Sequence, residues 1–410
     1  MAKKILILTQ LFDPEPTLKG LVFARELVKK KYEIEVLTGF PNYPTGKIYS
    51  GYKKKFFKIE WIDGVKITRI PIYPSHDKFV FKRILNYISF AISSLIYLLL
   101  YPKKFDLIYA YHPPVSVAIV AILIRYFKKT PIVVDVQDIW PDSIKATGMV
   151  KCKFILNILN YICDKVYKHS DFIVVLSPGF KKLLMTRGVD KDKIRVIYNW
   201  ANENLLKFQT GHLPKCFLIK NKFRIVFAGN IGKAQSLSTI LESAKILQKI
   251  NSSVVFIFIG DGIEKAALIS RANELNLKNV FFLPFMPMNK IGILLKEADA
   301  LLVHLKNNKL FDITIPSKTQ AYMAIGKPIL MAVKGDAAYL VKVSKSGVVT
   351  KGEDVVGIAK AAIFLASMKS SELSNMGLMA KKYYEQNLSL KAGVNKFDML
   401  FKCILSSERR

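Results

Sequence analysis

Short apolar runs alternate with longer segments of helical periodicity along the first half of the chain. The runs are rich in β-branched and aromatic residues, which predicts the strands "KILILTQLF", "EIEVLTG", "VKITRIPI", "DLIYAY", "PIVVDVQD", "FIVVLS" and "IRVIYN". Hydrophobic residues recur at helical spacing over 19–31, 84–100, 115–127 and 153–168. Strands that alternate with helices predict βαβ units and a parallel sheet that is covered on both faces.

The second half repeats this rhythm. Its predicted strands are "FRIVFAG", "SVVFIFIG", "VFFLPF", "ALLVHL" and "PILMAV", and its predicted helices are 234–250, 263–276, 288–297 and 318–325. Residues 201–221 show no clean period and mark a boundary. We therefore predict an α/β fold of two doubly wound, Rossmann-like domains, 1–200 and 201–385, which face each other across a ligand-binding cleft. Residues 386–410 are predicted to form a helix that could cross back to the first domain.

Composition narrows the class of protein. The chain has 410 residues, 51% of them hydrophobic, which predicts a globular protein of two or three domains. A net charge of +32 favours a polyanionic partner, which could be nucleic acid, an anionic membrane or a phosphorylated substrate. Lysine runs such as 29–31 and 53–55 could equally be solvated surface. The four cysteines form no C-x-x-C pair, so we expect reduced thiols and no zinc site.

One apolar segment stands out, "ILNYISFAISSLIYLLLY" at residues 84–101. It is somewhat shorter than the roughly 20 apolar residues that a membrane-spanning helix needs. Lys82, Arg83, Lys103 and Lys104 flank it. This pattern predicts either a buried helix or a helix that lies in a membrane interface. The first apolar run is too short for the hydrophobic region of a signal peptide and lacks a cleavage site.

Three junctions between a strand and a helix in the second half could hold phosphate. "FAGNIGKAQSL" brings Gly229, Gly232 and Lys233 to such a junction, and "IGDG" is a similar turn. "IPSK" starts a helix at Ser317 and Lys318. Free backbone N–H groups at a helix N-terminus attract anions, and lysine can neutralise them. Each junction alone could be a plain turn, but their coincidence favours a phosphate-bearing ligand.

The first half offers residues suited to a sugar. Asp138, Trp140 and Asp142 lie in "VQDIWPDS" after a predicted strand. An aromatic face can pack on a sugar ring while carboxylates bind its hydroxyl groups. The alternative is a Trp packed in a loop, with Asp142 as a helix cap. His112 ends another predicted strand and could bind a ligand or have a structural role.

These motifs together resemble a known family. The chain is similar to family 4 glycosyltransferases of the GT-B fold, in the branch that builds O-antigen, capsule and colanic-acid-type polysaccharides. The resemblance is carried in order by "LTGFPNYPTG", "DVQDIWPDS", "VLSPGF", "VIYNW", "FAGNIGKAQSL", "IGDG" and "IPSKTQAYMAIGKPI". Such enzymes move a sugar from a nucleotide diphosphate to a lipid-linked or saccharide acceptor, typically retain the anomeric configuration and need no metal or other cofactor.

The resemblance implies roles for individual residues. The expected donor-binding residues are Gly20, Gly229, Asn230, Lys233, Pro284, Phe285, Ser317, Lys318 and Gln320. The expected acceptor-binding residues are Asn42, Tyr43, His112, Trp140 and Asp142. Asp138 is the expected catalytic carboxylate. In a retaining transfer the departing phosphate oxygen can take the acceptor's proton, so protein groups need only stabilise charge.

The chain departs from the family pattern at two places. Many members carry two glutamates eight residues apart, one of which holds the ribose. Counting back from Gly326, these places are Ile313 and Ala321, so ribose contacts must come from elsewhere, with Gln320 as a candidate. Many members also have a histidine where this chain reads Gln137–Asp138.

The resemblance also implies partners and a location. We expect a nucleotide-sugar donor, with a UDP-sugar as the first candidate, and a polyprenyl-diphosphate-linked or saccharide acceptor. We expect a cytoplasmic protein bound peripherally to the inner face of the cytoplasmic membrane, where its positive charge meets an anionic surface rather than nucleic acid. Three alternatives are a nucleotide-sugar 2-epimerase of the same fold, a transferase-like protein without activity and a nucleic-acid-binding protein; the last lacks a recognition motif.

Overall fold

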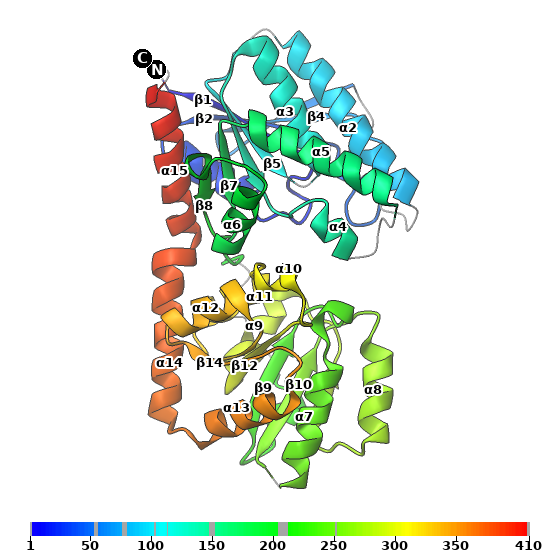
Figure 1. Cartoon of the computed structure of the whole chain (residues 1–410), viewed down its shortest axis with the longest axis vertical. Coiled ribbons are helices and arrows are strands. Elements are labelled where there is room, and N and C mark those ends of the chain that lie inside the picture. Colours follow the sequence, from blue (N-terminus) through cyan, green and yellow to red (C-terminus); the bar gives the residue numbers. More distant parts are fainter. Residues whose placement is uncertain are drawn as a thin grey trace. The chain divides into compact units, whose positions relative to one another are not determined.

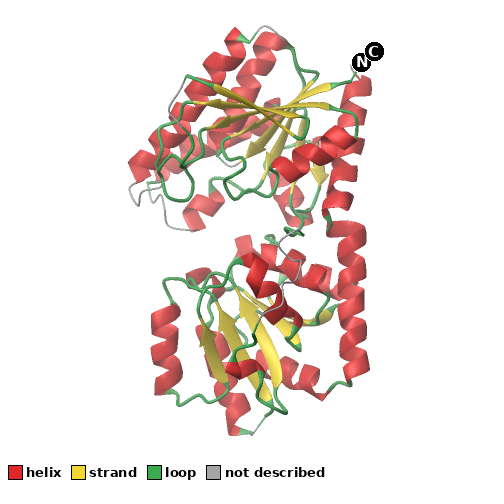
Figure 2. Cartoon of the chain, turned by 180° about the vertical axis from the view of Figure 1, so that it is seen from behind, coloured by secondary structure: helices red, strands yellow, loops and turns green. Residues whose placement is uncertain are grey.

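The computed structural model describes residues 2–52, 56–75, 80–101, 104–112, 114–146, 152–203, 212–250 and 252–407. The chain divides into two compact units (Figures 1 and 2). The first contains the described residues up to Ile197 and those from Val394 onward, and the second contains Tyr198–Gly393. The predicted boundaries therefore need correction, because residues 198–200 and 386–393 belong to the second unit. Next to these two segments, the Ala201 N–H donates a hydrogen bond to Tyr384 Oη (3.1 Å).

The first unit is built on an eight-stranded sheet in the order β3-β4-β2-β1-β5-β6-β7-β8. The strands are β1 Lys4–Thr9, β2 Glu33–Gly39, β3 Lys58–Ile62, β4 Val65–Ile70, β5 Leu107–His112, β6 Ile132–Val136, β7 Phe172–Val175 and β8 Ile194–Val196. All neighbours pair in parallel except β3 and β4. The strand order reverses between β1 and β5, where Ile5 lies opposite Leu107.

Helices cover both faces of this sheet. They are α1 Leu21–Lys29, α2 Val80–Leu100, α3 Val115–Lys128, α4 Asp142–Ala146, α5 Lys153–His169, α6 Pro178–Thr186, the 3₁₀ turn η1 Lys191–Lys193 and α15 Leu390–Ser407. Helices α2, α3 and α5 lie side by side on one face (Figure 1). On the other face α15 packs against α1, with the rings of Phe397 and Phe23 5.1 Å apart between their centroids.

The second unit contains a six-stranded parallel sheet in the order β11-β10-β9-β12-β13-β14. Its strands are β9 Phe223–Ala228, β10 Val254–Ile259, β11 Val280–Leu283, β12 Ala300–His304, β13 Ile329–Ala332 and β14 Gly347–Thr350. Its helices are η2 Lys215–Phe217, η3 Lys233–Gln235, α7 Ser238–Lys249, α8 Lys265–Glu274, α9 Met288–Lys296, α10 Lys309–Asp312, α11 Ser317–Ile325, α12 Gly335–Val343, α13 Val355–Ser367, α14 Ser370–Tyr383 and the π-helical segment η4 Tyr384–Leu388. This order is that of a dinucleotide-binding fold, with its reversal between β9 and β12.

Most of the predicted strands are buried on both faces, although β8 and β11 are only partly buried. All six residues of β10 are buried, and one core cluster on each side of the second sheet encloses its strands. β3 was not predicted, since none of its five residues is buried and it pairs at the sheet edge. The fold prediction of two doubly wound α/β domains is confirmed.

Candidate functional site

The reversal point of the second sheet brings two predicted segments together. Gly229 directly follows β9. Helix α11 begins at Ser317, and the short helix α10 with its flanking loops separates it from β12. Gly229 has φ of +136°, a backbone conformation that favours glycine. The loop after β10 packs closely against Gly229, because a Cβ atom on Gly260 would lie 1.9 Å from the Gly229 carbonyl oxygen. The backbone here is therefore packed closely and open on one side.

Lys318 reaches from α11 to this glycine. Its Nζ lies 3.5 Å from the centroid of the Phe227 ring and 3.5 Å from where a Gly229 Cβ would stand. The helix start is partly exposed, but Nζ itself is buried and has no hydrogen-bond partner among the described residues. Burial lowers the pKa of the Lys318 ammonium from 10.5 to about 7. Among the described residues, no hydrogen-bond acceptor compensates the protonated Lys318.

The start of α11 suits the same anion. Pro316 precedes it, no side chain caps it, and its first turn carries no acidic residue. Ser317 is exposed at this terminus. Helix N-termini with free N–H groups favour negative charge, especially phosphate. Gln320 is buried instead, and with its amide nitrogen turned inward it donates to the carbonyl oxygens of Pro316 (2.9 Å) and Ser317 (3.3 Å).

The remaining donor candidates lie on the same edge of the sheet. Asn230 and Lys233 are exposed in the loop after β9, and Pro284 and Phe285 are exposed after β11, two strands away. Lys265 was not predicted, yet it fixes this edge. Its Nζ donates to the carbonyl oxygens of Gly260 (2.8 Å) and Leu283 (3.2 Å), which joins the ends of β10 and β11.

A histidine network, also not predicted, braces the other side of this edge. The buried His304 ring pairs with the Gln235 carbonyl oxygen through Nδ1 (2.6 Å) and accepts the Glu353 N–H at Nε2 (3.0 Å). These partners fix the proton on Nδ1, and burial lowers the pKa of His304. Burial raises the pKa of Glu353, but hydrogen bonds from the Asn307 N–H and the Ser236 hydroxyl outweigh it, so the net shift is downward. The network ties the loops after β9, β12 and β14 together.

The first sheet carries a buried ion pair at its reversal point. Lys19 and Asp135 are both fully buried, and the Asp135 carboxylate also accepts hydrogen bonds from the Tyr109 hydroxyl and from Gln137 Nε2 (2.6 Å). Burial lowers the pKa of Lys19, and the negative charge of Asp135 opposes that shift. Asp135 thus positions Gln137, the first residue of the Gln137–Asp138 pair found where many family members have a histidine.

Glu15 organises the loop that contains two acceptor candidates. Its carboxylate accepts the N–H groups of Asn42 (2.7 Å) and Tyr43 (2.8 Å). The Asn42 side chain is buried and donates to the Phe40 carbonyl oxygen, while Tyr43 is partly exposed. Burial raises the pKa of Glu15, although these N–H groups oppose the shift. Asn42 therefore shapes the loop, and Tyr43 is the member that solvent reaches.

The loop after β6 presents Asp138 and encloses its neighbours. Asp138 is exposed at the carboxyl end of the strand; burial raises the pKa of its carboxyl above 3.8, and contact with solvent limits that effect. Asp142 forms an ion pair with Arg187, whose guanidinium also donates to the Trp140 carbonyl oxygen (3.1 Å). Asp142 therefore helps to hold the loop.

His112 and Gly20 complete the predicted set. His112 is buried at the end of β5, 6.0 Å from the Trp140 ring between centroids, and its ring nitrogens have no hydrogen-bond partner among the described residues. Burial lowers the pKa of His112 to about 4, so the ring is neutral. A Cβ on Gly20 would lie 2.0 Å from an Asp13 carboxylate oxygen that accepts the Leu21 N–H at the start of α1. The absence of a side chain at Gly20 therefore makes room for Asp13.

Comparison with known proteins identifies the chain. The family model "Glycosyl transferase 4-like domain" matches residues 21–200, and "Glycosyl transferases group 1" matches residues 213–383. The two glycosyltransferase models together match most of the chain, so the chain is a glycosyltransferase whose second unit carries the group 1 match.

Curated relatives of this transferase lie in bacteria and archaea. It is 26% identical over 340 residues to a protein named as the colanic acid biosynthesis glycosyl transferase WcaI of Escherichia coli K12, which spans 79% of this chain and 81% of that one. It is 25% identical over 294 residues to a protein named as the glycosyltransferase WbjE of Pseudomonas aeruginosa, which spans 70% and 72%. An uncharacterised glycosyltransferase of Methanocaldococcus jannaschii is 21% identical over 257 residues, 61% of this chain and 64% of that one.

Solved structures share the transferase's fold. Anabaena HepE in complex with UDP has a TM-score of 0.67 at 14% identity and covers 98% of this chain and 100% of its own. Sucrose-phosphate synthase from Thermosynechococcus elongatus has a TM-score of 0.71 at 13% identity and covers 99% and 100%. The predicted family resemblance and the GT-B fold are thereby confirmed.

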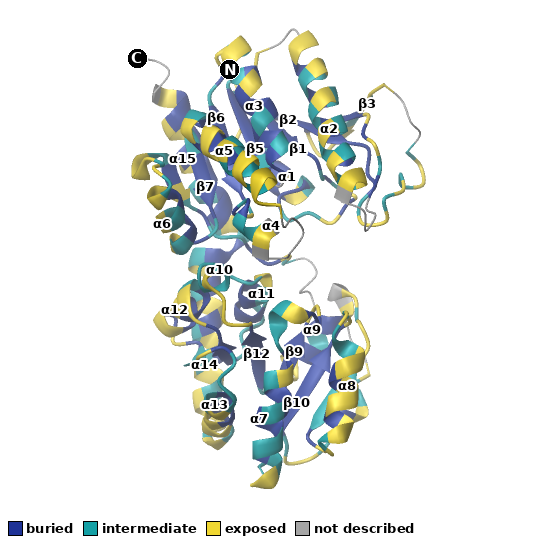
Figure 3. Ribbon diagram, turned by 45° about the vertical axis from the view of Figure 1, so that its right-hand side comes forward, coloured by how far each residue is buried: buried dark blue, intermediate teal, exposed yellow. Residues whose placement is uncertain are grey.

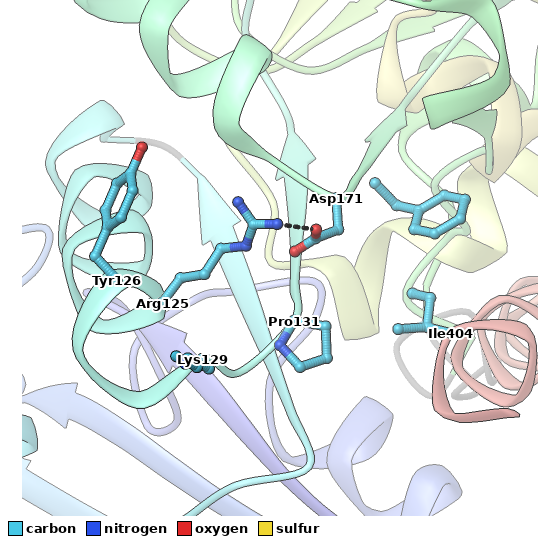
Figure 4. A pocket seen from close by; sticks show the side chains of 7 residues that line it. Arg125, Tyr126, Lys129, Pro131, Asp171 and Ile404 are labelled. Carbon is cyan, nitrogen blue, oxygen red and sulfur yellow. Dashed lines mark hydrogen bonds and ion pairs between the residues drawn. The ribbon is translucent and has the colours of Figure 1, made fainter. Parts of the chain in front are cut away.

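A cavity elsewhere in the transferase is not part of this site. It has a volume of about 510 Å³ and lies at the opposite edge of the first sheet, where β6 and β7 begin (Figure 4). Arg125 and Lys129 line it, and Asp171 pairs with Arg125 there. The Arg125 guanidinium is thus neutralised within the protein, unlike Lys318. Among the described residues, no group of three or more His, Cys, Asp or Glu side chains is placed to hold a metal ion.

Proposed function

We propose that this transferase moves a sugar from a nucleotide diphosphate sugar to a lipid-linked or saccharide acceptor during synthesis of a cell-surface polysaccharide. The named role of the Escherichia coli relative in colanic acid biosynthesis supports the class of product. Structures of the same fold in complex with UDP and with UDP-glucose support a UDP-sugar as the first donor to test.

The observation that carries the donor assignment is the buried Lys318 ammonium. It has no hydrogen-bond partner among the described residues, and it lies between the open face of Gly229 and the start of α11. Removing a cation from water without a counter-charge costs several kcal/mol, so a bound anion would recover part of that loss. The donor diphosphate rests here, with Ser317 on the helix side and Asn230 and Lys233 on the loop side.

The other predicted residues receive narrower roles. Pro284 and Phe285 are placed to receive the nucleobase, because they are exposed beyond the end of β11 on the same sheet edge. In the first unit, Asp138, Tyr43 and Trp140 lie at the carboxyl edge, are fully or partly exposed, and face the acceptor. Asn42, Asp142 and Gln320 act through the loops and the helix that they hold.

The proposed reaction moves the acceptor's proton without a protein base. The acceptor oxygen forms a bond to the anomeric carbon as the bond from that carbon to the diphosphate breaks, on the same face of the sugar. The acceptor's proton passes to the departing phosphate oxygen. Attack on the face from which the diphosphate departs gives retention. Protonated Lys318 and the α11 N–H groups stabilise the charge that develops on the diphosphate, which is the role that a metal ion would otherwise fill.

Calorimetry tests the donor assignment directly. Lys318→Ala should weaken UDP binding by about ten- to a hundred-fold, since a lost charge-assisted contact costs roughly 1.5–3 kcal/mol. Lys249→Ala is the matched control, because it removes one exposed lysine from the far end of α7 in the same unit. Equal UDP affinity in the Lys318 variant and the parent would refute the placement.

A further inference from the structure

Helix α2 buries polar residues and exposes apolar ones, the reverse of an ordinary surface helix. Its polar residues Asn86 and Ser94 are buried, and Phe90 and Leu98 lie on the same inner face. Asn86 accepts a hydrogen bond from Gln10 Nε2 (2.5 Å) and donates to the Tyr73 carbonyl oxygen (2.6 Å). The inner face is thus fixed to the sheet through both polar and apolar contacts.

The outer face of α2 is a line of isoleucines. Ile84, Ile88, Ile92 and Ile96 recur every four residues and therefore share one face of the helix. All four are exposed, Ile92 and Ile96 each to 53%, and Phe81 and Leu100 continue the stripe at its two ends. Exposed apolar stripes of this length are unusual on a monomeric soluble surface and mark an interaction site.

The edge of the sheet extends this apolar surface. The Phe57 ring lies 6.5 Å from the α2 residue Tyr97 between centroids, which makes β3 and its approach continuous with α2. Phe56 and Trp61 are exposed to 92% and 67%. We call the isoleucine stripe of α2 together with Phe56, Phe57 and Trp61 the α2–β3 surface. Figure 3 shows exposed residues along α2.

Basic residues lie at the ends of this surface. Lys82 is exposed at the start of α2, next to Arg83, and Lys104 is exposed beyond its end, while Lys103 lies outside the described residues. The first turn of α2 contains no acidic residue. In a symmetric pair of copies these cations would meet the same cations, and the net charge of +32 would repel a second copy. An anionic partner that also accepts apolar side chains fits better.

We propose that the α2–β3 surface docks on an anionic lipid bilayer, with its isoleucines and aromatic side chains among the acyl chains and its cations at the phosphate headgroups. Residues Phe81–Leu100 are apolar and long enough to cross a membrane, but core helices pass the same test. Here only 22% of that stretch is buried, too little for a core helix. The inner face of α2 is hydrogen-bonded to the sheet, so the helix lies along the bilayer rather than across it.

Vesicle sedimentation of the full chain, without substrates, tests docking independently of the proposed donor site. The parent should bind vesicles of phosphatidylcholine with phosphatidylglycerol, and it should bind pure phosphatidylcholine less well. Ile88→Gln combined with Ile92→Gln should reduce binding by about tenfold or more, because two half-exposed side chains no longer insert. Raising the salt concentration should release part of the parent protein, as the headgroup attraction is screened.

The matched control removes two equally exposed apolar residues from the second unit. Phe364→Gln combined with Leu378→Gln, at 53% and 66% exposure, should leave vesicle binding unchanged. Equal loss in both double variants, or a stripe variant that binds like the parent, would overturn the proposal. A parent protein that does not bind anionic vesicles would also overturn the proposal. A parent dimer that the stripe variant dissociates, seen by analytical ultracentrifugation without lipid, would assign the surface to self-association instead.

Trp61 reports the depth of insertion. Brominated phosphatidylcholine, mixed with phosphatidylglycerol, should quench part of the tryptophan fluorescence, and Trp61→Phe should remove the quenched part. The remaining tryptophans, Trp140 and Trp200, are partly exposed and buried, respectively. Sedimentation with vesicles but no quenching of Trp61 would mean attachment by charge alone, which would overturn the inserted arrangement.

Discussion

The carboxyl edges of the two sheets differ in whether their buried charged side chains have partners. In the first unit Lys19 is buried against Asp135, and Glu15 is buried against three backbone N–H groups. In the second unit Lys318 is buried with no hydrogen-bond partner among the described residues. Both edges lie at the reversal point of a doubly wound sheet, where such folds bind ligands.

The difference teaches which edge is complete as folded. A buried charge with its partner in place stabilises a particular arrangement and leaves little for a ligand to add. A buried cation without a partner destabilises the free protein and strengthens the binding of whatever supplies the missing negative charge. The buried charges of the first edge therefore have their partners within the protein, and the second edge is where we propose that an anion binds.

The largest expected effect is a loss of stability in the first unit. Lys19→Met should lower the free energy of unfolding by about 3–5 kcal/mol, because it leaves the Asp135 carboxylate buried without its cation. Scanning calorimetry should show the loss. Adding Asp135→Leu should recover part of it, because no buried charge remains. A Lys19 variant as stable as the parent would mean that the pair is not needed.

Asp138 is exposed at the carboxyl edge of the first sheet, and turnover measurements test its role. Asp138→Asn should lower turnover by about a hundred-fold or more and shift Tm by only a few degrees, because the side chain is exposed and outside the buried network. Glycosyl transfer and thermal unfolding would be measured on the same preparation. An unfolded variant, or one with parental turnover, would remove Asp138 from the reaction.

The pH dependence of donor binding tests the role of Lys318 at the carboxyl edge of the second sheet. With a pKa of about 7 in the free protein, Lys318 is half protonated at pH 7, and diphosphate binding requires its protonated form. UDP affinity should therefore fall by up to about fifty-fold between pH 7 and pH 9, with net proton uptake on binding. Calorimetry in buffers of different ionisation enthalpy measures that uptake. In Lys318→Met the pH dependence should vanish.

The smallest expected effect is a gain of stability, opposite in sign to the loss expected for Lys19→Met. Lys318→Met should raise the free energy of unfolding by about 1–2 kcal/mol at pH 6, because it removes a buried charge that has no hydrogen-bond partner among the described residues. The native pKa of about 7 lies below the ordinary 10.5, so the unfolded chain binds more protons between these values. Parental stability therefore rises with pH across this window, and the advantage of the variant shrinks. A destabilised variant at pH 6 would show that Lys318 is not an unmatched charge.

The sequence predicted what depends on local pattern. Fully buried strands such as β10 read as apolar runs, and the Pro-Ser-Lys start of α11 led to Lys318. It missed Lys19 and Asp135, which lie 116 positions apart and meet only through the sheet. An aspartate inside the apolar run "PIVVDVQD" was the available hint, since a carboxylate buried in a strand needs a partner. His304 and Glu353 were missed for the same reason.

Helix α15 has a consequence for how the chain is made. The first unit uses residues from both sides of the second, because Asp398 accepts the Tyr32 hydroxyl (2.8 Å) and Phe397 packs on Phe23 and Tyr109. The second unit is one uninterrupted stretch. During synthesis on the ribosome, the second unit can therefore finish folding while the first still exposes Phe23 to solvent or to chaperones. The part of the enzyme translated first is the part completed last.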